Sequence, residues 1–338
     1  MSADATVAKI RTVFGNALTI NDYHEMTNRQ SVPELCEYLK TCERYSEFLA
    51  DVEPATIHRG YLEQLIRKES LVTYTRLAKF QQSGSKGFYS FYIKKLETVQ
   101  LISFLEMFYA SLNEEYLASV PGYMTEYSKL PLLELSACRS FDEILKMLKK
   151  TEYYKPLKGA VPADGSTPPL ERCERALRVH YYDGVLKSAK KELSDNEYKQ
   201  IQKLIGTDAD LINYTNAHRM RKYFSLDGDE IESRSLPYSR IGRAKMQQLY
   251  HMGDPEDMER FMDKTVYKND DPDQTIESRN ARTRLALVRH MIEVTSSAAA
   301  ALFAYMMICD IEAANIIHII EGIRYKADLS EIEGQLAV

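Results

Sequence analysis

The chain has 338 residues, of which 44% are hydrophobic and 28% charged, and a formal net charge of −5. This composition is ample for two or three packed domains, and the negative charge excludes a global basic field of the kind that binds nucleic acid or anionic lipid. The five cysteines form no C-x-x-C pair, which favours reduced thiols in a cytosolic protein over a disulfide framework or a zinc site.

The N-terminal segment predicts a helix over residues 5–17. Its first ten residues are polar and lack an apolar signal core, so we do not expect secretion. The helix stops before Leu18-Thr19, where Thr19 is a suitable N-cap for the next helix. A leucine directly followed by a preferred N-cap residue recurs at Leu112-Asn113, Leu226-Asp227 and Leu329-Ser330. Four such junctions for three repeats predict that residues 1–17 complete the third repeat and close the units into a ring.

A short capped helix, which we call the cassette, occurs three times. The clearest copy starts at Ser140, whose hydroxyl can accept from a first-turn amide while Glu143 reaches back to the Ser140 amide, forming a capping box. Its apolar residues have helical spacing: Phe141, Ile144, Leu145 and Leu148. The other copies start at Ser31 and Asp254. Each copy ends in a Lys-Thr pair with a tyrosine beyond it: Lys40-Thr41 with Tyr45, Lys150-Thr151 with Tyr153, and Lys264-Thr265 with Tyr267.

The Lys-Thr pairs lie 110 and 114 residues apart, which indicates a threefold internal repeat. We predict helical repeats over residues 18–130, 131–239 and 240–338, the last completed by residues 1–17.

Long helical patterns follow each cassette. In the first repeat, a helix after Pro54, a Gly/Ser turn at residues 81–87 and a second helix over 88–111 predict an antiparallel helix pair. In the second repeat, the Pro/Gly-rich segment 155–169 predicts an exposed linker.

Two further long helices are predicted in the second repeat, over residues 170–193 and 195–224, with Asp195 as the N-cap of the latter. In the third repeat, an acidic turn at 269–273 precedes helices over 275–294 and 296–325.

The sequence predicts an all-α fold, because no segment shows sustained period-2 alternation of strand-forming residues. The most apolar stretch, Val294 to Cys309, has 16 residues, fewer than the ~20 that a membrane-spanning helix needs. We therefore expect a buried helix there and no direct membrane span.

The last long helix of each repeat carries an acid, two intervening residues and an amide. The pairs are Glu97 with Gln100, Asp210 with Asn213, and Glu312 with Asn315. This spacing places both side chains on one helix face. A buried carboxylate needs hydrogen bonds, and the neighbouring amide is one suitable partner. We interpret these six residues as helix-pinning groups, with contact to a partner shaft as the alternative.

A basic patch formed by Arg219, Arg221 and Lys222 lies near a predicted helix end. It is a candidate partner contact, and the alternative is a favourable interaction with the helix C-terminus. The metal, calcium-loop and phosphate-loop motifs are all incomplete. We therefore assign no catalytic residue, metal or cofactor.

The whole chain resembles the C subunit of prokaryotic A/V-type rotary ATPases, the relative of the d subunit in eukaryotic vacuolar ATPases. The resemblance rests on the opening Ala8-Lys9-Ile10-Arg11, on the three cassettes, and on the closing segment Asp310-Ile311-Glu312-Ala313-Ala314-Asn315-Ile316. The first copy departs from the family pattern, since Gln100 replaces Asn and Glu106 and Phe108 stand where basic residues are common.

The resemblance implies three similar helical-bundle domains in a pseudo-threefold funnel. It also implies a non-catalytic rotor component that sits on the cytoplasmic face of the membrane proteolipid ring and receives a central shaft made of the D and F subunits. Such a component passes torque during ATP-coupled transport of protons or sodium, while catalysis occurs elsewhere in the complex. The alternative is an all-helical scaffold or adaptor unrelated to ATPases.

Overall fold

The computed structural model describes residues 3–79, 87–268 and 275–338. Within these ranges it is helical with no strand, which confirms the all-α prediction. The longer helices are α1 (Ala3–Gly15), α5 (Arg59–Lys79), α6 (Phe91–Tyr109), α12 (Leu170–Glu192), α13 (Asp195–Phe224), α17 (Ile276–Val294) and α18 (Ala298–Tyr325).

Short helices connect the long ones: α2 (Ile20–Thr27), α3 (Val32–Thr41), α4 (Glu43–Ser46), α7 (Asn113–Ser119), α8 (Met124–Tyr127), α9 (Leu132–Leu135), α10 (Phe141–Leu148), α11 (Tyr154–Ala160), α14 (Gly228–Arg234), α15 (Arg243–Tyr250), α16 (Pro255–Met262) and α19 (Leu329–Gln335). Two 3₁₀ turns, Pro54–Thr56 and Phe88–Ser90, precede α5 and α6. The predicted acidic turn at 269–273, and all but the last residue of the predicted turn at 81–87, lie outside the described residues.

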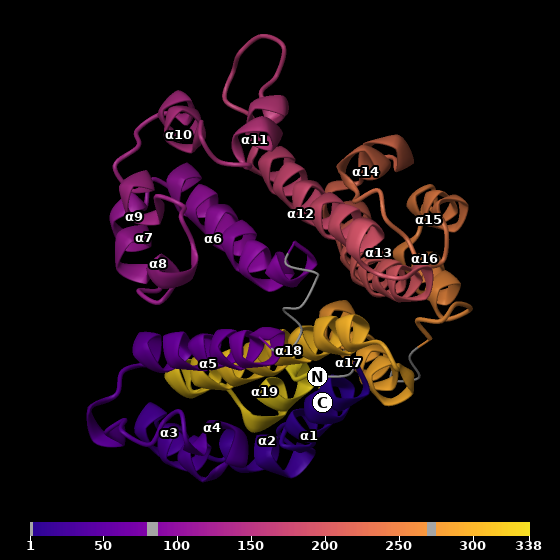
Figure 1. The fold of residues 1–338 in the computed structure, drawn as a ribbon. Coiled ribbons are helices and arrows are strands. Elements are labelled where there is room, and N and C mark those ends of the chain that lie inside the picture. The colour runs from indigo at the N-terminus through magenta and orange to yellow at the C-terminus, as the bar shows by residue number, and fades with distance from the viewer. Residues whose placement is uncertain (1–2, 80–86, 269–274) are drawn as a thin grey trace.

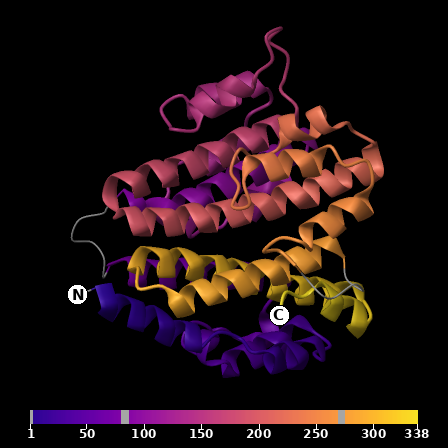
Figure 2. The ribbon, with the colours of Figure 1, turned by 90° about the vertical axis from the view of Figure 1, so that its right-hand side faces the viewer.

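The long helices form two groups that run side by side (Figures 1 and 2). One half contains α5, α17 and α18, flanked by α1–α4 and α19. The other contains α6, α12 and α13, flanked by α7–α11 and α14–α16. The predicted antiparallel pairing of the two helices after the first cassette is wrong. Helix α5 packs mainly on α18, and α6 packs mainly on α12. The two helices meet each other near one end, where the Tyr74 ring contacts Phe91 and Tyr92.

Helix α18 lies at the centre of the fold. Every residue from Ala298 to Cys309 is buried, and the helix packs against α1, α5, α13 and α17. It is long and apolar enough to cross a membrane, but 83% of its most apolar window is buried inside the fold. Its apolar surface is therefore used for internal packing, as in the core helix of a soluble domain.

The cassettes form α3, α10 and α16. In α10, Ser140 Oγ accepts from the Glu143 amide at 3.3 Å, and all four predicted apolar residues are buried. The second predicted capping bond is wrong. The Glu143 carboxylate accepts from the amide of Arg139 at 2.7 Å, one residue before the N-cap. The same geometry recurs at the start of α3, with Ser31, Glu34 and Gln30 in the corresponding places.

Two of the four leucine junctions have the predicted caps, since Thr19 and Asp227 both form full capping boxes. The other two differ. Asn113 lies inside α7, where its amide group donates to the carbonyls of Ser136 and Cys138. At the last junction, Asp328 precedes the helix in place of Ser330.

Two other expectations are corrected. The N-cap of α13 is Ser194, whose side chain accepts from the Glu197 amide, so the predicted Asp195 is one residue late. The predicted linker 155–169 is helical in its first part, because Leu157 and Ala160 of α11 are buried; the remaining loop is visible at the top of Figure 1.

Candidate functional site

Each of the three recurring acids accepts a hydrogen bond from the tyrosine that follows a cassette. The bonds are Tyr153 Oη to Glu97 Oε2 at 2.7 Å, Tyr267 Oη to Asp210 Oδ2 at 2.6 Å, and Tyr45 Oη to Glu312 Oε1 at 2.9 Å. We call these the three acid–tyrosine junctions. Each ties a short cassette to a long helix that is far from it in the sequence.

A second donor reaches each acid from the chain that leads into the same cassette. The donors are Ser128 Oγ to Glu97 at 2.6 Å, the amides of Arg240 and Ile241 to Asp210 at 2.8 and 3.1 Å, and the amide of Leu18 to Glu312 at 3.2 Å. The same arrangement therefore occurs three times with different residues.

The junctions connect successive copies in a cycle. The second cassette holds the acid of the first copy, and the third cassette holds the acid of the second. The first cassette holds Glu312, the acid of the last copy, across 267 positions of sequence. Helix α1 also packs along α18. The first and last parts of the described chain thus pack against each other.

The amides reach other segments and not the neighbouring acids. Asn213 exchanges two hydrogen bonds with the backbone of Leu236, at 2.9 and 2.8 Å. Asn315 makes the same pair of bonds with the backbone of Ala337, at 2.8 and 3.0 Å. Gln100 is half-buried and makes no comparable bond among the described residues. The departure from Asn in the first copy thus coincides with the loss of this contact.

The Glu312 junction contains a buried cation. Arg44 contacts Glu312 at 3.0 Å and Glu69 at 2.9 Å, and all three side chains are less than 10% exposed. Burial raises the pKa of Glu312, while Arg44 and the Tyr45 hydroxyl act in the opposite direction. Burial likewise raises the pKa of Asp210, and one of its oxygens, Oδ1, is buried without a partner among the described residues.

The three residues of the basic patch have separate partners. Arg219 pairs with Glu277 at 2.7 Å and is 53% exposed, so it remains available to a binding partner. Arg221 donates to the carbonyl of Tyr250, the last residue of α15, at 2.8 Å. The Lys222 ammonium lies 5.6 Å from the centre of the Tyr223 ring.

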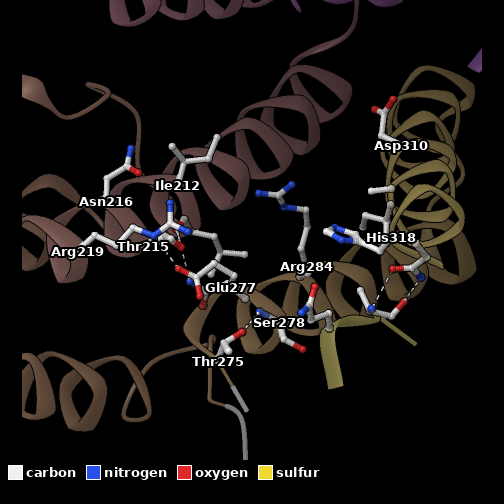
Figure 3. A pocket seen from close by; sticks show the side chains of 18 of the residues that line it. Ile212, Thr215, Asn216, Arg219, Thr275, Glu277, Ser278, Arg284, Asp310 and His318 are labelled. Carbon is white, nitrogen blue, oxygen red and sulfur yellow. Dashed lines mark hydrogen bonds and ion pairs between the residues drawn. The ribbon is translucent and has the colours of Figure 1, made fainter. Parts of the chain in front are cut away.

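A pocket of about 680 Å³ lies between the two halves of the molecule. Its walls come from α12, α13, α17, α18 and the segment around α19, and Figure 3 shows Arg284 and His318 projecting into it. Arg219 and Asn315 line this pocket, whereas the other seven predicted site residues do not. Sequence reasoning missed the pocket because its lining comes from five separate segments.

Residues 6–335 match the family model described as ATP synthase (C/AC39) subunit. Three relatives, each named as the C subunit of A-type ATP synthase, are similar to parts of the chain. The proteins of Methanococcoides burtonii, Methanosphaera stadtmanae and Methanosarcina mazei are 26%, 24% and 24% identical over 66%, 61% and 67% of this chain.

These three alignments span 60%, 51% and 60% of the relatives' own lengths. The family match covers almost the whole chain and excludes the alternative of an unrelated helical scaffold.

Proposed function

Because the chain belongs to the ATP synthase (C/AC39) subunit family, we propose that it is the non-catalytic rotor component that links a central shaft to the membrane ring. The observation that carries this proposal is the family match over residues 6–335. The shaft partner is the complex of the D and F subunits, and the membrane partner is the proteolipid ring. Torque passes through the chain during ATP-coupled cation transport.

The cyclic order of the acid–tyrosine junctions supports a three-unit funnel. We propose units over residues 18–130, 131–239 and 240–338, with residues 1–17 completing the last. Each junction ties one unit to the next, because the cassette of one repeat binds the acid of the repeat before it. Networks that join long helices through buried polar groups resist shear, as a torque-carrying part requires.

The pocket of about 680 Å³ is the proposed seat for the end of the shaft. It is lined by side chains of both charges together with amides and hydroxyls, including Arg219, Glu277 and Asn216. Such a lining suits a polar protein surface that must be held in one orientation.

We place the protein on the cytoplasmic face of the membrane, attached peripherally through the proteolipid ring. The burial of α18 within the fold supports this placement, because its apolar surface already packs against other helices.

The proposal is tested by capture of a purified D–F complex on the immobilised chain. We expect the wild-type chain to retain D–F, and the double variant Arg219→Glu, Arg221→Glu to retain less. The matched control is Lys190→Glu, Lys191→Glu, a charge reversal of two exposed residues at the end of α12. Failure of the wild-type chain to bind D–F would overturn the proposal. Equal binding by both double variants would remove the basic patch from the interface.

A further inference from the structure

Three charged residues occupy equivalent positions on the three long helices that carry the recurring acids. Lys95 of α6, Asp208 of α13 and Asp310 of α18 each stand two residues before the acid of their copy. All three line one small cavity of about 20 Å³. The three helices therefore approach one another at the same position of each repeat, and each helix carries a charged residue there.

The charges at this point are paired and hydrogen-bonded. The Lys95 ammonium contacts the Asp310 carboxylate, which also accepts from Tyr92 Oη at 3.2 Å. Asp208 pairs with Arg284 of α17 at 3.1 Å and accepts a hydrogen bond from Tyr182.

The two ion pairs are reciprocal across the two halves of the molecule. The half built on α6 and α13 supplies the cation Lys95 and the anion Asp208, and the half built on α17 and α18 supplies Arg284 and Asp310. Each pair therefore joins one half to the other, and sliding of the halves would break both.

These side chains lie between the exposed and fully buried extremes. Asp208 is 18% exposed, Arg284 28%, and Lys95 and Asp310 31% each. Attraction between charges at this depth is stronger than on an open surface, where screening by water and salt is more complete. Burial acts to raise the pKa of Asp208, but Arg284, Lys95 and the Tyr182 hydroxyl outweigh it and lower the pKa, so this carboxylate stays ionised.

The ion pairs also form part of the pocket wall. Arg284 and Asp310 both line the pocket (Figure 3). The Nε of Arg284 is buried and has no hydrogen-bond partner among the described residues. A shift of one half against the other would consequently move pocket-lining atoms.

We infer that the two halves are held by an ionic junction of four positioning residues: Lys95, Asp208, Arg284 and Asp310. This junction fixes the two halves relative to each other and thereby sets the shape of the pocket. The identity of the pocket's partner rests on the function proposed above. The junction itself rests on the contacts between the two halves.

The test reverses and then restores one pair. The single variant Lys95→Asp places like charges opposite each other, and the double variant Lys95→Asp, Asp310→Lys restores an opposite pair. The matched control is Lys94→Asp, Glu152→Lys, which swaps an ion pair at the neighbouring position of α6 that lies within one half of the molecule. Circular dichroism checks that each chain is folded, and Lys95→Met replaces Lys95→Asp if the latter does not fold.

The first readout is the distance between spin labels on the two halves, attached at Val99→Cys on α6 and Ala286→Cys on α17, both exposed positions. We expect a narrow distribution in the wild type and the control, a broader or shifted one in Lys95→Asp, and a return to the narrow one in the double variant. An unchanged distribution in Lys95→Asp would overturn the junction.

The second readout is affinity for the D–F complex. We expect roughly tenfold weaker binding by Lys95→Asp, a typical size for coupling between two sites, and recovery in the double variant. A changed distance with unchanged affinity would overturn the link between junction and pocket. If the wild type binds no D–F, the proposed function fails while the distance measurement still decides the junction.

Discussion

Arg44 is the residue on which the Glu312 junction depends most. It lies between the carboxylates of Glu69 and Glu312, at 2.9 and 3.0 Å, with almost no exposed surface. Replacing it by Met would leave two buried carboxylates without their cation. We expect Arg44→Met to lower the free energy of unfolding by about 3 kcal/mol or more. Urea denaturation of the wild type and the variant measures this loss.

The loss of unfolding free energy in Arg44→Met should depend on pH. Burial raises the pKa of Glu312 in the folded chain, and Arg44 opposes that rise. A carboxyl whose pKa is raised in the folded state binds its proton more tightly there than in the unfolded state. Protonation therefore favours folding at low pH, and this stabilisation is lost as the pH rises through the folded-state pKa. Removing Arg44 raises that pKa further. The deficit should therefore shrink between about pH 7.5 and about pH 5.5, and a deficit that grows would contradict this account.

The tyrosine hydroxyls at the junctions have a smaller, measurable effect. Tyr267→Phe removes the 2.6 Å bond to Asp210 and leaves only the amides of Arg240 and Ile241 on that oxygen. We expect a loss of about 2 kcal/mol in the free energy of unfolding, as for other hydrogen bonds to charged groups. The control Tyr61→Phe, at a 46% exposed side chain, should change it by less than about 0.5 kcal/mol.

At the scale of helices, a strained residue directly follows the last residue of the long α13. Ser225 has φ 53°, in the left-handed region, and its amide donates to the carbonyl of Met220. A residue with a Cβ atom costs roughly 1–2 kcal/mol there, and glycine does not. We expect Ser225→Gly to stabilise the fold by about 1 kcal/mol. Ser225→Ala keeps the strain and should give no gain; equal stabilisation by both would contradict the explanation.

Helix positions could largely be predicted from the sequence, because caps and apolar spacing are local signals. The stripe of α10 is an example, since its spacing alone identifies the buried face. The backbone groups that individual polar side chains reach could not be predicted. Glu143 bonds the Arg139 amide in place of the Ser140 amide, and Asn113 bonds two carbonyls more than 20 residues away. These choices are decided by which backbone groups the folded chain brings within reach.

The candidate site also combines features that local sequence patterns predict with contacts that only the folded chain reveals. The acid and amide positions were visible as a repeated pattern, but their partners were not, because Tyr45 and Glu312 lie at opposite ends of the chain. Arg44 has no counterpart in the repeated pattern, so nothing in the sequence pointed to it. A sequence signal did exist for three of the four ionic-junction residues. Lys95, Asp208 and Asp310 each stand two residues before a recurring acid.

At the scale of the whole molecule, three acid–tyrosine junctions tie the cassettes to the long helices, and two ion pairs join the two halves. The pocket lies where these halves meet, with walls from α13, α17 and α18. A partner seated there would contact both halves at once. In the proposed role, these contacts between the halves would carry force from a seated partner through the molecule.

The most direct test is the affinity of the D–F complex for a chain whose pocket is filled. Ala314 is exposed and lines the pocket, so Ala314→Trp occupies the proposed seat without disturbing the core. Ala286 is also exposed, on α17, but does not line the pocket, and Ala286→Trp is the matched control. Isothermal titration should show tight binding by the wild type and the control and loss of binding by Ala314→Trp. Equal affinity in all three chains would contradict the assignment of the pocket as the seat of the shaft.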